Sequence, residues 1–148
     1  MWPPEALEFL RDLEANNDRD WFKANRARYD AHLLEPARAL AEQAAGVHPH
    51  DPAVHLLLGR IELAAGRPAA GVDELRSALR LDPLLVAAHR CLGYALVATG
   101  RFAEAVEQWD QWERLAARSE AELAQLDDVR RAKTAAQTLG GTGAGLHG

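Results

Sequence analysis

The feature that most constrains this chain is a near-repetition of its own sequence after 34 residues. When residues 47–80 are aligned with residues 81–114, 11 of the 34 positions are identical, whereas chance would give about three. The two segments read "LGRIELAAGRPAAGV" and "LGYALVATGRFAEAV" from Leu58 and from Leu92. A period of this length is typical of repeat proteins, in which each unit buries its apolar face against the next.

Each half of the unit has the pattern of a helix, so the unit predicts a helix hairpin. Residues 53–65 and 86–99 are apolar over a broad face, as a buried first helix would be. Gly66 and Gly100 follow these helices, where a left-handed C-terminal turn favours a residue without a Cβ. Gly93, like Gly59 in the first unit, stands inside a helix and indicates close approach of the partner helix.

The pattern resembles the tetratricopeptide repeat over about residues 47–117, although a helix-hairpin solenoid of another type remains open. That family's unit has Leu-Gly in the first helix, small and bulky places in the second, and a closing proline. The residues that match are Leu58-Gly59, Leu92-Gly93, Gly71, Ala105, Leu75, Trp109, Ala78 and Pro83. The residues that depart are His55, His89, Glu62, Leu96, Trp112 and Ala117. The resemblance implies an all-α fold, a short right-handed helix-hairpin solenoid, with an N-terminal helical segment and a C-terminal capping helix around two hairpins.

The N-terminal segment, residues 1–46, carries a second resemblance. Residues 9–40 resemble the start of the domain of unknown function 2461 family, but the long body of that family is absent after about Ala41. The matching residues are Phe9-Leu10, Leu13, Asn16-Asn17, Arg19, Trp21-Phe22, Asn25-Arg26, Tyr29 and Pro36. Two interpretations stay open: a fused fragment, or a degenerate preceding hairpin over residues 20–46 with His32 in place of the turn glycine.

The sequence after the repeats predicts one capping helix over residues 118–138. Ser119 followed by Glu122 is a capping-box signature, and Leu123, Leu126 and Val129 form an apolar stripe. Residues 139–148 are expected to be a flexible tail. The "GAGLHG" within it has the letters of a dinucleotide-binding motif, but that motif needs a strand before it and a helix after it.

Composition narrows the partner classes. Helix formers dominate, and 17 basic residues are interleaved with 22 acidic ones for a net charge of −5, so nucleic acid is not an expected partner. We expect no membrane association, because no apolar run approaches the roughly 20 residues of a membrane span. The start lacks the pattern of a signal peptide, so the expected location is cytoplasmic.

Few residues suggest chemistry. His48, His50, Asp51 and His55 are potential metal ligands, but they fit better as an inter-repeat turn with a helix cap. Cys91 lies in an apolar helix, where an inert buried thiol is the common case. We therefore expect no catalytic residue, no metal site and no cofactor, and a protein that is not an enzyme.

The tetratricopeptide resemblance implies a binding groove lined by the first helices of successive hairpins. The groove residues that carry our hypothesis are Leu56, Arg60, Leu63, Arg90, Tyr94 and Val97, with the small Ala53 and Ala87 at the edge. Arginine holds carboxylates with paired donors, so the expected partner is a protein or peptide with an acidic group near Arg60 and Arg90. Three alternatives stay open: solvated arginines without a partner, a purely structural fusion product, and a fusion remnant with an unknown enzymatic or ligand-binding role. A homo-oligomer also stays open.

Overall fold

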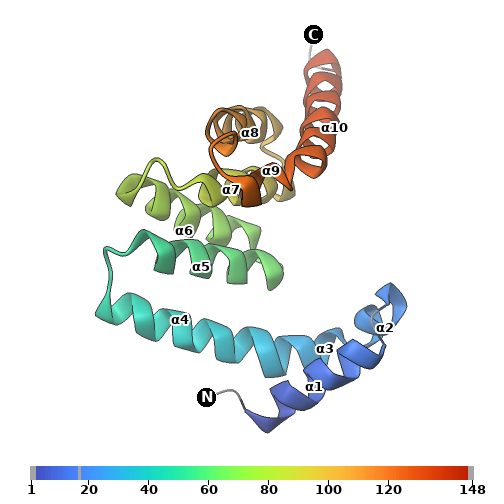
Figure 1. The fold of residues 1–148 in the computed structure, drawn as a ribbon. Helices are drawn as coiled ribbons and strands as arrows, with labels where there is room; N and C mark the ends of the chain where they lie inside the picture. Colours follow the sequence, from blue (N-terminus) through green and yellow to red (C-terminus); the bar gives the residue numbers. More distant parts are fainter. Residues whose placement is uncertain (1–2, 17, 147–148) are drawn as a thin grey trace.

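The computed structural model describes residues 3–16 and 18–146, with side chains through residue 141. Within these ranges the regular structure is helical and contains no strand, which confirms the all-α prediction. From α4 to α8 the helices follow one another in chain order, with α1 at one end of the stack and α10 at the other (Figure 1). No helix in the described part of the chain is long and apolar enough to cross a membrane.

Two antiparallel hairpins form the middle of the stack, as the 34-residue period predicts. The first consists of α5 (Pro52–Ala64) and α6 (Pro68–Leu81), and the second of α7 (Val86–Ala98) and α8 (Phe102–Ala116). Both predicted turn glycines, Gly66 and Gly100, have φ of +78°, a backbone conformation that residues with a Cβ rarely adopt. The hairpin turns are therefore fixed by the local sequence.

The Leu-Gly glycines let the two helices of each hairpin approach closely. A Cβ placed on Gly93 would lie 2.2 Å from Nε1 of Trp109, and one on Gly59 would lie 2.6 Å from Cγ of Leu75. Trp109 and Leu75 are fully buried in the main core. The bulky place of each unit thus packs directly on the glycine of the preceding helix, which explains why a helix interior tolerates the propensity cost of glycine.

The N-terminal segment is helical and contains a cluster of aromatic side chains. It comprises α1 (Pro4–Ala15), α2 (Arg19–Ala24), α3 (Arg26–Tyr29), the π-helix η1 (Asp30–Leu34) and α4 (Glu35–Val47). Phe9 is fully buried, with its ring centroid 5.7 Å from Trp21 and 6.0 Å from Tyr29. Phe22 packs on Tyr29 at 5.1 Å. The residues of the N-terminal motif therefore pack mainly on one another.

The degenerate hairpin considered for residues 20–46 is wrong. At His32, where such a hairpin would turn, the helix continues through η1 from Arg26 to Val47. Without a glycine to take the left-handed turn, the chain follows a π-helical segment and stays in one direction. The preceding helix that packs on this run is α1, which contacts α3 and η1.

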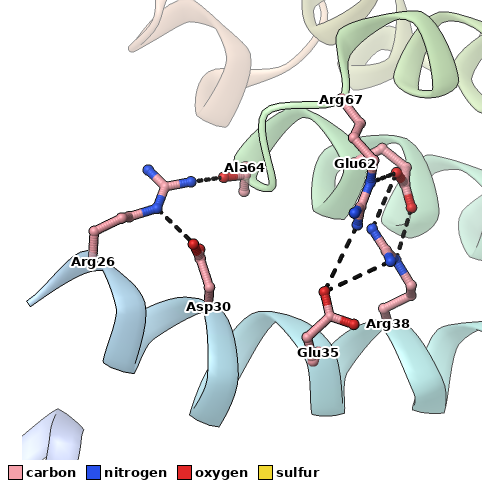
Figure 2. A network of polar contacts seen from close by, with 7 residues as sticks. All are labelled: Arg26, Asp30, Glu35, Arg38, Glu62, Ala64 and Arg67. Carbon is pink, nitrogen blue, oxygen red and sulfur yellow. Dashed lines mark hydrogen bonds and ion pairs between the residues drawn. The ribbon is translucent and has the colours of Figure 1, made fainter.

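A polar network joins the N-terminal segment to the first hairpin (Figure 2). Glu62 on α5 is its centre: its carboxylate lies 2.6 Å from Arg67 Nε and accepts a hydrogen bond from Arg38 Nη2 at 3.2 Å. Arg38 Nε lies 2.9 Å from Glu62 Oε1 as an ionic contact without hydrogen-bond geometry. Glu35 on α4 lies 3.6 Å from Arg38 and 3.9 Å from Arg67. The charges of the two parts therefore compensate one another across the junction.

Two further contacts complete this junction. Arg26 pairs with Asp30 at 3.0 Å and donates to the carbonyl of Ala64 at the end of α5. Beneath the network lies a small apolar cluster of Ala41, Leu58 and Ile61. The N-terminal segment thus covers the open end of the first hairpin with a thin apolar layer and a polar rim.

The C-terminal region differs from the single capping helix predicted for residues 118–138. It consists of a short α9 (Glu120–Leu123) and a long α10 (Leu126–Leu146), and α10 packs on α8 with Val129 and Ala136 buried. The tail predicted for residues 139–148 is helical to Leu146, whereas residues 147–148 lie outside the described part. α10 covers the apolar side of the last hairpin, as a cap should.

Candidate functional site

The predicted groove residues occupy equivalent places on the two first helices. Leu56, Arg60 and Leu63 stand on α5, and 34 residues later Arg90, Tyr94 and Val97 stand on α7. Spacings of four and three residues put each trio on one side of its helix. Because α5 and α7 contact each other, the six residues form one surface, which we call the α5/α7 face.

The apolar members of the α5/α7 face are only half-exposed. Leu56, Leu63, Tyr94 and Val97 pack against the main core from outside. The Tyr94 ring meets Trp109 edge-on, with centroids 5.2 Å apart and an interplanar angle of 71°. Burial raises the pKa of the Tyr94 phenol while Arg90 opposes the rise, so its hydroxyl stays neutral and can donate. The floor of this face is therefore held against the main core.

Arg90 is already paired within the fold. Its Nε donates to Oε2 of Glu122 on α9 at 2.9 Å, and Nε1 of Trp112 donates to the same oxygen at 2.8 Å. Burial would raise the pKa of Glu122, but these two hydrogen bonds outweigh it and hold the pKa below its ordinary value. Burial likewise lowers the pKa of Arg90, yet the bond to Glu122 raises it overall. Arg90 therefore fixes the cap and is not a free cation.

Arg60 is the exposed cation of the α5/α7 face. Its charge acts on Cys91 and on Glu122 across the face, but among the described residues it forms no ion pair or hydrogen bond. Leu56 and Leu63 flank it on α5. The face thus presents one guanidinium without a direct ion-pair partner beside apolar side chains.

Sequence reasoning did not assign Glu122 and Trp112 to this region. The capping-box prediction was half right: the backbone N–H of Glu122 donates to Oγ of Ser119, which caps α9. The Glu122 carboxylate, however, binds Arg90 and Trp112 instead of the cap backbone. No local pattern reports a contact between residues 32 positions apart, so the spacing that indicated the cap could not indicate this ion pair.

The histidines of the two units serve as bridges inside each hairpin. His55 Nδ1 lies 2.9 Å from Glu74 Oε2, and its Nε2 lies 2.8 Å from the Pro49 carbonyl. His89 repeats this geometry with Gln108 and the Pro83 carbonyl, so both ring nitrogens of each histidine have partners. His48 and His50 are exposed, and no three metal-ligating side chains gather among the described residues.

Two family models match the chain, one on each side of the junction. Residues 5–59 match "Conserved hypothetical protein (DUF2461)", and residues 63–121 match "Tetratricopeptide repeat". Residues 63–121 are thus similar to a tetratricopeptide repeat. The N-terminal match extends beyond the resemblance seen over residues 9–40 and includes the start of α5, so the two families meet inside the first hairpin. No curated protein gives a significant match to the chain.

The repeat segment supports a protein-interaction role in general. Such repeats present rigid helical surfaces to partner proteins. The N-terminal family is uncharacterised, so its match adds no activity.

Proposed function

We propose that the chain is a binding module without catalytic chemistry, and that it holds a peptide segment of a partner protein on the α5/α7 face. The observation that carries this proposal is Arg60, an exposed guanidinium without a described ion-pair partner, between Leu56 and Leu63. Arginine is enriched among the residues that dominate interface energies, and the apolar side chains beside Arg60 can exclude water from such a contact.

The occupant that suits this face is a peptide with an acidic side chain at Arg60 and apolar side chains on either side. A carboxylate can accept two hydrogen bonds from a guanidinium, which fixes its orientation as well as its position. Tyr94, with its ring held against Trp109, offers a hydroxyl and a rigid apolar edge. Arg90 has no direct part in this proposal, because Glu122 already occupies its Nε.

The packing of the N-terminal segment also favours this proposal over an activity derived from the N-terminal family. Phe9, Trp21 and Tyr29 contact one another, and Arg28 pairs with Asp12 at 2.7 Å while stacking on the Phe9 ring. These motif residues have structural partners within the segment. A role in closing the end of the repeat accounts for them.

Affinity capture from lysate with three immobilised proteins tests the proposal. The wild-type chain should retain a stoichiometric partner, and Arg60→Glu should reduce its recovery at least about tenfold, since a charge reversal replaces attraction with repulsion. Arg11→Glu, at an exposed arginine on α1, is the matched control and should capture as the wild type does. Equal capture by Arg60→Glu, with an unchanged melting temperature, would remove the α5/α7 face from consideration.

A further inference from the structure

A polar groove lies between α6, α7 and α8, on a different side of α7 from the α5/α7 face. It is an open cavity of about 370 Å³. Leu79 and Leu92 provide apolar lining, and Arg76, Arg80, Gln108 and Gln111 provide polar lining. No lining residue among those described is acidic, although the chain as a whole carries a net charge of −5.

The two arginines of this groove are only partly compensated. Arg76 Nη2 lies 2.9 Å from Glu104 Oε2, and Glu104 is also paired with Arg101. Arg80 Nη2 donates to the neutral Ser77 hydroxyl at 2.8 Å, and no carboxylate among the described residues pairs with it. The groove therefore carries a positive charge that the fold leaves without a full counter-charge.

His55 in the first unit is equivalent to His89, and there the chain itself supplies a carboxylate. There His55 Nδ1 lies 2.9 Å from Oε2 of Glu74. In the second hairpin His89 Nδ1 lies 2.9 Å from Oε1 of Gln108, and Nε2 of each ring lies 2.8 Å from a proline carbonyl. The geometry is repeated, but a neutral amide replaces the negative charge.

The groove's arginines stand on α6, and the positions one period earlier lie on α4, outside the repeat. Thirty-four residues before Arg76 and Arg80 stand Glu42 and Gly46. The His55 place has a carboxylate of the chain, Glu74, whereas the His89 place has the neutral Gln108. The neutral Gln108, together with Arg80, which has no carboxylate partner among the described residues, points to a negative group from outside the chain.

We propose that the groove binds a carboxylate carried on a short apolar body. The carboxylate accepts hydrogen bonds from Arg80 and from the amides of Gln108 and Gln111, and the apolar part lies over Leu79 and Leu92. Two sources share this chemistry: a small aliphatic acid, and the C-terminus of a peptide that ends in an apolar residue. This site is separate from the α5/α7 face, so its failure would leave the proposed function standing.

Titrations followed by ¹H–¹⁵N correlation spectra of the full chain test this site with defined probes. Hexanoate should shift the amides of residues 76–80 and 108–111, and the uncharged hexanamide should not. Arg80→Gln should weaken hexanoate binding about tenfold, because it removes the guanidinium that holds the carboxylate. Gln108→Glu should weaken it as much, because it places a carboxylate of the chain beside His89, as Glu74 stands beside His55. Arg114→Gln, at the equivalent arginine of the second unit, is the matched control and should bind hexanoate as the wild type does.

The source of the carboxylate is distinguished with acetyl-dileucine and its C-terminal amide. Tighter, Arg80-dependent binding of the acid form than of hexanoate assigns the groove to peptide C-termini, and the opposite order assigns it to small acids. The proposal is overturned if hexanamide binds as tightly as hexanoate, or if Arg80→Gln and Gln108→Glu bind hexanoate like the wild type. It is also overturned if neither acid shifts these amide signals at about 10 mM, a concentration at which even a site with a millimolar Kd is mostly filled. Melting curves of each variant confirm that a loss of binding is not a loss of fold.

Discussion

Replacing Gly93 by alanine is expected to destabilise the chain although alanine is the better helix former. The new Cβ would lie 2.2, 2.4 and 2.7 Å from Nε1, Cε2 and Cδ1 of Trp109, whose ring is fully buried. The indole must move, and its hydrogen bond to the Arg90 carbonyl (3.2 Å) must stretch or break. Overpacking costs about 1–3 kcal/mol, and the gain in helix propensity returns about 1 kcal/mol. Contacts this short favour the upper end, so the net loss should be about 2 kcal/mol.

Urea denaturation followed by circular dichroism measures this loss against two matched glycines. In Gly59→Ala the new Cβ would lie 2.6 and 2.8 Å from Cγ and Cδ2 of Leu75. Because the leucine side chain is more flexible than an indole ring, the loss of stability should be smaller. Gly46→Ala meets nothing within 4 Å and should be neutral or slightly stabilising. Trp109→Leu gives the second unit the glycine–leucine pair that Gly59 and Leu75 form in the first unit. In this background Gly93→Ala should lower the free energy of unfolding by less than it does beside Trp109. The reasoning fails if Gly93→Ala is as stable as the wild type.

Two other predictions concern charged groups. The hydrogen bonds to Glu74 and to the Pro49 carbonyl raise the pKa of His55 above 6.5, so the stabilisation they give is complete below the unfolded-state pKa and is lost as pH rises through the folded-state pKa. The free energy of unfolding should therefore fall between about pH 6 and pH 8.5, and Glu74→Gln should make this fall smaller. An unchanged fall in the variant would exclude the His55–Glu74 pair as its cause. Glu122→Gln should lower the free energy of unfolding by about 1–3 kcal/mol, because it leaves the half-buried Arg90 without a counter-charge. A loss near zero in urea denaturation would mean that this ion pair does not hold the cap.

The hairpins could be predicted because their determinants are local and occur twice. Gly66 and Gly100 stop one helix and turn the chain, and the apolar period indicates which side is buried. The equivalent places of the six groove residues follow from the same period, since two copies of one unit put position 56 beside position 90. This part of the fold needs no information from distant residues.

The departures from prediction all arise from contacts or continuations that no short pattern reports. The charge of Arg90 looked available, but Glu122 reaches it from a helix that follows the repeat. At His32 the absence of a turn glycine was visible, yet the sequence did not say whether the chain would turn or continue through a π-helix. Glu62 looked like a departure from the repeat pattern, and only the structure shows that it holds the N-terminal segment in place.

Hydrogen exchange of the chain, alone and saturated with its captured partner, tests the central claim most directly. Binding on the α5/α7 face predicts new protection in peptides from α5 and α7, residues 52–64 and 86–98, with little change in α6 and α8. The Arg60→Glu variant under the same conditions should show no such protection. Protection confined to α6 and α8, or to the N-terminal segment before residue 47, would contradict the account.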